Sequence, residues 1–259
     1  MNLRRIILQA SCSGYGSGYG DEFDDKFNYN TWFVSNFLSR QIRKMKIPTD
    51  GPYNTLFCYI TKNINSCKLI EHLNNLEIGI HFSETAYNRY MGMKAEHERF
   101  RFYLSLLEKG YQIASAYHYI PFNEIRKLHQ ALEDSGYKNE WLFKKKRIKE
   151  YGITITLEHV LTTYDYRLML KVSDLKNNLL GEGPIYVTYP DDIFFNKNVR
   201  HLVVEQGRLI VTDFLDIPQF VCDLRELQKG IVKSKCVYEH TRKYIPNDDN
   251  RWEFERLKW

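Results

Sequence analysis

The chain has 259 residues, of which 43% are hydrophobic and 15% aromatic, and its formal net charge is +5. This length and composition exclude a disordered chain and provide the apolar side chains of a large core. This mildly basic net charge is not typical of a dedicated nucleic-acid-binding protein, which usually clusters its excess of basic residues on one face.

The beginning of the chain predicts a β-strand at residues 5–11 and not an export signal. Its apolar run, residues 6–8, stops at Gln9 and is shorter than the ~7–15 apolar residues of a signal peptide. No stretch approaches the ~20 apolar residues that cross a membrane. The cysteines number five, lie far apart and form no C-x-x-C motif, so we expect reduced thiols in a cytoplasmic protein without a structural zinc site.

A segment rich in glycine, tyrosine and acids, SGYGSGYGDEFDD at residues 13–25, follows this strand. A dinucleotide-binding loop has the pattern G-x-G-x-x-G and leads directly into a helix. Here the glycines alternate with other residues, and four carboxylates follow that would repel a phosphate. A calcium loop would need a glycine at its sixth position and a glutamate at its twelfth, and DEFDDKFNYNTW has neither. We therefore expect no bound cofactor and no metal here.

Two interpretations of this segment remain. It is a mobile connecting loop, or it is a recognition surface in which tyrosines supply contact area and acids attract a basic partner protein. The partner-binding residues of the second interpretation are Tyr15, Tyr19, Asp21, Glu22, Asp24 and Asp25.

Strands and helices are expected to alternate through residues 1–136. Apolar residues at helical spacing predict a helix capped by Asn30 and ending at residue 46, and Ser83 is placed to cap a long helix that ends before Gly110. The other elements predicted in this half are a strand at 55–60, a short helix at 66–75, strands at 76–82 and 111–120, and a helix at 121–136. This alternation predicts an α/β fold with a mainly parallel sheet and packed helices.

The second half is predicted to be antiparallel and β-rich. Two strands flank a turn near Tyr164, a further strand covers residues 183–190, and Gln206-Gly207 joins two more strands in a tight hairpin. A helix is predicted at 218–229. No flexible linker separates the halves, so we expect one compact unit, residues 1–259, with sub-regions 1–136 and 137–259.

A basic segment, WLFKKKRIKEYG, covers residues 141–152. Its cations are Lys144, Lys145, Lys146, Arg147 and Lys149. The interleaved aromatic residues Trp141, Phe143 and Tyr151 would allow this segment to bind RNA or single-stranded DNA. The same cations would equally protect an exposed edge strand from pairing with another chain.

No sequence pattern identifies a catalytic residue, because neither H-E-x-x-H nor G-x-S-x-G occurs. We therefore expect a protein that binds another macromolecule without catalysis of its own, such as an inhibitor or immunity-type partner of a basic protein, for example a nuclease toxin. Two alternatives stay open. One is a metal-dependent hydrolase or nuclease with a scattered Asp/Glu site, for which Asp191 and Asp192 are candidates. The other is binding of RNA or single-stranded DNA through residues 141–151.

Overall fold

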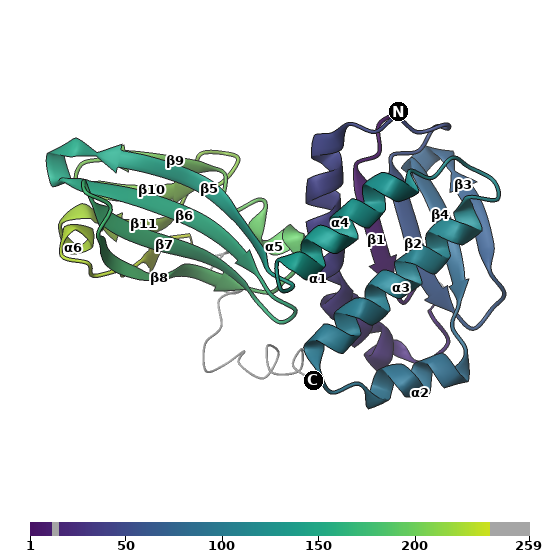
Figure 1. Ribbon diagram of the computed structural model, residues 1–259. Coiled ribbons are helices and arrows are strands. Elements are labelled where there is room, and N and C mark those ends of the chain that lie inside the picture. The colour runs from purple at the N-terminus through teal and green to yellow at the C-terminus, as the bar shows by residue number, and fades with distance from the viewer. Residues whose placement is uncertain (12–15, 239–259) are drawn as a thin grey trace. The chain divides into compact units, whose positions relative to one another are not determined.

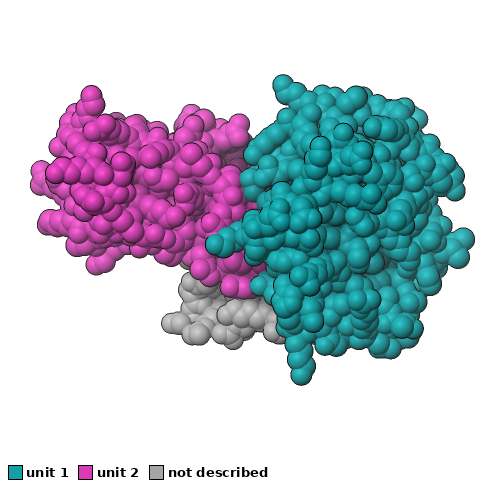
Figure 2. All heavy atoms as spheres, viewed as in Figure 1, with its two compact units in different colours: residues 1–138, 259 teal, residues 139–258 magenta. Residues whose placement is uncertain are grey.

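The computed structural model describes residues 1–11 and 16–238 and divides into two compact units (Figure 2). Unit 1 is Met1–Lys138, and unit 2 begins at Asn139. This boundary lies close to the predicted change of character after residue 136. That the two units form one compact body stays a prediction. No helix among the described residues is long and apolar enough to cross a membrane.

Unit 1 is a mixed sheet with helices packed on it, as predicted (Figure 1). Its strand order is β1-β2-β4-β3, in which β1, β2 and β4 are parallel and β3 is antiparallel to β4. The helices of unit 1 are α1 (Asp21–Met45), α2 (Glu84–Gly92), α3 (Glu96–Ala114) and α4 (Phe122–Asp134), with the single-turn η1 (Glu71–Leu73). Its strands are β1 (Arg5–Gln9), β2 (Thr55–Thr61), β3 (Ser66–Ile70) and β4 (Asn75–His81).

The core of unit 1 lies between one face of this sheet and the helices. Alternate strand residues point to one face, and those in register on this face, such as Ile6, Leu56 and Leu76, are fully buried. Helices α1 and α3 meet through Phe33 and Phe100, whose rings stack with centroids 4.8 Å apart. Burial of these apolar side chains is the main contribution to the stability of the unit.

Polar side chains of α1 seal the open edge of β1. The hydroxyl groups of Thr31, Ser35 and Ser39 follow each other at helical spacing and lie against this strand. Ser39 Oγ accepts from the Ile6 amide and donates to the Ile6 carbonyl, both at 3.0 Å. Ser35 Oγ accepts from the Leu8 amide at 3.1 Å, and Thr31 Oγ1 donates to the Leu8 carbonyl at 2.8 Å. The buried hydroxyls thus satisfy backbone groups that a lone edge strand would leave unpaired.

Three predictions for residues 66–120 were wrong. Residues 66–70 form β3 and not a helix, because this short apolar run can pair with β4, and periodicity alone does not separate the two for such runs. The predicted helix from Ser83 is two helices, α2 and α3, separated at residues 93–95. The helix does not end before Gly110, and residues 111–114 continue α3 in place of the predicted strand. At Gly110 a Cβ would lie 2.8 Å from Cys58 Sγ, so this glycine allows α3 to approach the sheet.

Unit 2 contains two four-stranded antiparallel sheets, of order β5-β6-β7-β8 and β12-β11-β10-β9. The first sheet comprises β5 (Asn139–Ile148), β6 (Ile153–Leu161), β7 (Tyr166–Asp174) and β8 (Leu179–Thr188). The second comprises β9 (His201–Glu205), β10 (Arg208–Thr212), β11 (Pro218–Asp223) and β12 (Lys235–Cys236). The helical turns are η2 (Lys149–Tyr151), α5 (Asp192–Phe195) and α6 (Leu224–Gln228). The predicted antiparallel character is confirmed, and the hairpin at Gln206-Gly207 has positive φ at both residues, as a two-residue turn of this kind requires.

The two sheets of unit 2 pack as a sandwich (Figure 1). Tyr186 of β8 and Phe220 of β11 stack with centroids 4.5 Å apart across its interior. At the β8 side the chain closes over the gap, where Ser234 Oγ donates to the Ile185 carbonyl at 2.7 Å. The prediction of a helix over 218–229 was wrong for its first half, because residues 218–223 pair with β10 and only α6 is helical.

Candidate functional site

The glycine-rich segment is tied to unit 1 over its described part, which begins at Gly16. The amide of Lys62, just after β2, donates to the Ser17 carbonyl at 3.1 Å. Gly18 and Gly20 have φ angles of 91° and 101°, which favour glycine. Helix α1 then begins at Asp21, nine residues before the predicted cap Asn30. The predicted acids therefore lie in the first turns of a helix and not in a connecting loop.

Tyr19 is packed against the neighbouring elements. Its ring stacks on Tyr87 of α2 with centroids 4.4 Å apart, and Lys62 Nζ lies 4.2 Å from the centroid of the Tyr19 ring. Its hydroxyl donates to the Phe82 carbonyl at 2.7 Å. Burial, together with the nearby carboxylate of Glu84, raises the pKa of Tyr19. A ring fixed in this way contributes to the fold of unit 1.

The predicted partner-binding residues do not form one surface. Asp24 is buried and accepts from the Ser17 amide at 2.9 Å and from the Ser17 hydroxyl. Asp21, Glu22 and Asp25 are exposed, and Glu22 pairs with Lys26 at 3.3 Å. Tyr15 lies outside the described residues. Of the predicted set, three acids at the beginning of α1 are exposed, and one of these, Glu22, is ion-paired.

The same geometry opposes a phosphate at this end of the sheet. In open α/β sheets, ligands bind outside the carboxyl ends of parallel strands, often at a helix N-terminus. Here the residues that follow β2 and β4, Lys62 and Phe82, both contact Tyr19, so this ring covers the strand ends. The first turn of α1 adds the carboxylates of Asp21 and Glu22, which would repel an anion.

The basic segment lies on β5, the edge strand of its sheet, and continues into the helical turn η2, which holds Lys149. Its members Lys144, Lys145, Lys146, Arg147 and Lys149 are all exposed, and none forms an ion pair with another described residue. A bulge at Phe143 interrupts the pairing with β6, and bulges are common at sheet edges. The nearest acid on β6, Glu158, is already paired with Lys171 of β7 at 2.7 Å. Within residues 1–11 and 16–238, therefore, no carboxylate neutralises these five cations through an ion pair.

The aromatic residues of this segment have different environments. Trp141 stacks on His159 of β6 with centroids 4.6 Å apart, and Phe143 meets the same ring edge-on at 5.2 Å. These two rings are half-buried and pack onto the sandwich. Tyr151, at the end of the segment, lines a pocket instead. A row of freely exposed stacking rings, which the sequence allowed, is not present on β5.

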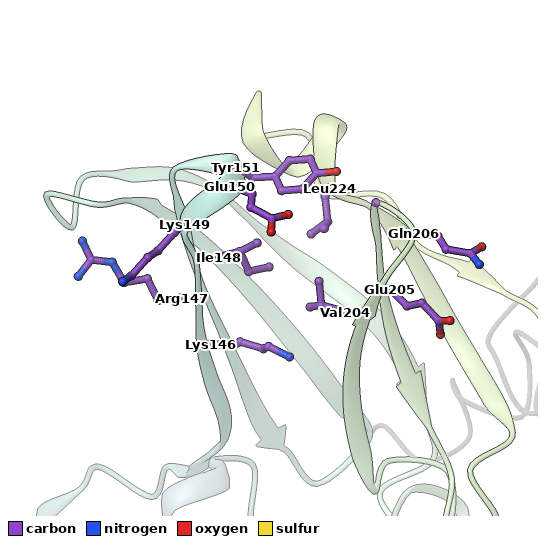
Figure 3. Close-up of a pocket in the computed structure, with 11 residues that line it drawn as sticks. Lys146, Arg147, Ile148, Lys149, Glu150, Tyr151, Val204, Glu205, Gln206 and Leu224 are labelled. Carbon is purple, nitrogen blue, oxygen red and sulfur yellow. The ribbon is translucent and has the colours of Figure 1, made fainter.

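A pocket of about 320 Å³ lies between the end of β5 and the β9–β10 hairpin (Figure 3). Ile148 of β5 and Val204 of β9 extend toward each other across it, and Leu224 closes one end. Lys146 lines one wall, and the Glu150 carboxylate reaches into the space, whereas Arg147 and Lys149 point to the other side of β5. Gly207 allows the hairpin to approach, because a Cβ there would lie 3.2 Å from the Tyr151 hydroxyl. The sequence indicated the basic wall of this pocket but not the apolar wall that β9 and α6 supply.

The carboxylates considered for a hydrolase have structural contacts. Asp191 accepts from the Ile193 amide at 2.9 Å and caps the short helix α5. Burial, with Asp192 adjacent, raises the pKa of Asp191 to about 6. Within residues 1–11 and 16–238, no group of three or more His, Cys, Asp or Glu side chains is arranged to hold a metal ion. The cysteines in these ranges, Cys58, Cys67, Cys222 and Cys236, are free.

Comparison of the chain with known protein families, with curated proteins and with solved structures gives no match. What the protein does must therefore be inferred from its own residues.

Proposed function

We propose that the protein binds another macromolecule and that its partner is single-stranded nucleic acid, held along β5 of unit 2. The observation that carries this proposal is the group of five exposed cations within residues 144–149, none of which is ion-paired with another described residue. Lysine and arginine side chains that bind phosphates release the condensed counterions of the strand, which makes such binding favourable at low salt. A single strand is favoured over a duplex because the pocket beside Tyr151 offers space for an unpaired base.

The test is a fluorescence anisotropy titration with a labelled single strand of about 20 nucleotides, longer than the ~4–16 nucleotides that one small binding fold covers. Each phosphate contact on a single strand contributes about 0.7 to the slope of log K against log salt, so five contacts give a slope of up to about −3.5. We expect a variant with glutamine at Lys144, Lys145, Lys146, Arg147 and Lys149 to lose most of this slope and most of the affinity.

A matched control removes the same charge elsewhere on unit 2. Its glutamine substitutions are at the exposed residues Lys176, Lys197, Lys229, Lys233 and Lys235. If both variants lose affinity equally, the binding depends on net charge and not on β5. If the strand does not bind to the native protein, or heparin binds with the same affinity and the same dependence on β5, nucleic acid is not the specific partner.

A protein partner with a basic surface is the second candidate. The observation that favours it is the exposure of Asp21, Glu22 and Asp25 at the beginning of α1. These acids would attract a basic protein and would speed its association mainly at low salt. Capture of a basic protein by the native chain, lost when these three acids become Asn or Gln and kept in the β5 variant, would assign the function to unit 1.

A further inference from the structure

The pocket beside β5 has a mixed lining whose parts suit different parts of one nucleotide. Val204 is a half-buried apolar residue from whose surface an aromatic ring can displace water, and the buried side chains of Ile148 and Leu224 lie behind it. The Tyr151 side chain adds an aromatic ring at the same pocket. The volume of about 320 Å³ is at the lower end of the range for small-ligand pockets, about 300–1,000 Å³.

The polar groups of the pocket differ on its two sides. Lys146 lines the wall formed by β5, the strand that also holds the exposed cations. The Glu150 carboxylate reaches into the pocket itself (Figure 3). A carboxylate accepts hydrogen bonds only, so its preferred ligand is a donor such as an exocyclic amino group. It would also repel a phosphate inside the pocket, which leaves the phosphates to the cations of β5.

We propose that this pocket takes one unpaired base of the bound strand, a base with an exocyclic amino group, an inference that rests on the proposed nucleic-acid binding. The ring lies against Ile148, Val204 and Tyr151, and its amino group donates to Glu150. Lys146 binds the phosphate next to that base. Among the pyrimidines, cytosine has such an amino group and thymine does not.

The test compares three labelled single strands of equal length: oligo-dC, oligo-dT and an abasic strand that has the sugar-phosphate backbone alone. We expect the native protein to bind oligo-dT about tenfold more tightly than the abasic strand, the value of roughly one base held against an aromatic ring, and to bind oligo-dC more tightly still because its amino group donates to Glu150. Val204→Phe fills the pocket and should reduce the affinity for oligo-dC to that for the abasic strand, while the abasic strand binds as before. Glu150→Gln should reduce the dC-to-dT affinity ratio several-fold, because the acceptor loses its charge and the new amide NH2 group can donate to thymine O4.

The outcomes separate this inference from the function on which it rests. If all three strands bind with the same salt dependence and affinity, or if both substitutions leave the affinity ratios unchanged, the base pocket is refuted and binding through β5 stands. If the abasic strand and both oligonucleotides fail to bind the native protein, the proposed function itself is refuted. Circular dichroism checks that Val204→Phe folds. If Val204→Phe does not fold, the Glu150→Gln variant provides the test, because Glu150 is exposed. Removing its negative charge raises the affinity for oligo-dC and oligo-dT alike, so this general gain does not change the dC-to-dT affinity ratio.

Discussion

Truncating Tyr19 separates a structural role of the glycine-rich segment from a role as a free binding surface. Removing a fully buried aromatic side chain costs about 3–5 kcal/mol, and Tyr19 is half-buried, so we expect Tyr19→Ala to lower the free energy of unfolding by about 2 kcal/mol. Tyr19→Phe keeps the ring contacts and removes only the 2.7 Å hydrogen bond to the Phe82 carbonyl, which should cost about 1 kcal/mol.

The assay is urea unfolding followed by circular dichroism, with thermal melts in parallel. A loss of 2 kcal/mol lowers Tm by about 6 °C in a domain of this size. Tyr117, which is 71% exposed, is the control, and its change to Ala should cost less than about 0.5 kcal/mol. A cost below about 0.5 kcal/mol for Tyr19→Ala would refute the packing argument and would restore this ring to the candidate binding surface.

Three further substitutions test the structure. Asp24→Ala should destabilise the fold by about 2 kcal/mol, because the Ser17 donors lose their acceptor. Asp25→Ala, at an exposed position, should cost less than about 0.5 kcal/mol. Equal costs for the two substitutions would contradict the buried contact between Asp24 and Ser17. Ser39→Ala leaves a backbone amide of β1 unpaired and should cost about 1–2 kcal/mol in urea unfolding, whereas Ser105→Ala on the exposed side of α3 should be neutral. Burial lowers the pKa of His129 to about 4, so the unfolded chain binds more protons between pH 6.5 and pH 4. Stability should fall by about 3 kcal/mol as the pH drops through this window, and His129→Leu should abolish that part of the pH profile.

The strands could be predicted from the sequence wherever a strong pattern coincided with a turn signal. The runs that became β6 and β7 alternate apolar and polar residues about a turn, and Gln206-Gly207 marks the β9–β10 hairpin. Gly110 shows why other boundaries were missed. A glycine after a helical run indicates either a helix end or a close approach of the helix to its neighbours, and only the position of Cys58 decides between them.

The candidate site could be predicted only in part, for a related reason. Exposure of the β5 cations follows from their charge, so the basic segment could be recognised from composition alone. The pocket beside it depends on Val204 and Leu224, which are far from β5 in the sequence and reach it only after the two sheets pack. The buried Asp24 was missed because four acids within five residues look alike in a sequence, and its contact with Ser17 depends on the path of the backbone.

Comparison of two edge strands, β1 and β5, indicates a second role for the β5 cations, which is to prevent the edge from pairing with another chain. This role must be separated from binding by experiment. The backbone of β1 is closed by hydroxyl groups from α1, so that edge needs no charge to prevent pairing with another chain. No helix provides such hydroxyls along β5 within the described residues, and lysines at an exposed edge do oppose aggregation. The two roles differ in their concentration dependence. If the cations only protect the edge, the β5 glutamine variant should associate with itself as protein concentration rises while its affinity for a single strand stays unchanged. If they bind phosphate, the affinity and the salt dependence should fall in dilute protein, where self-association does not occur.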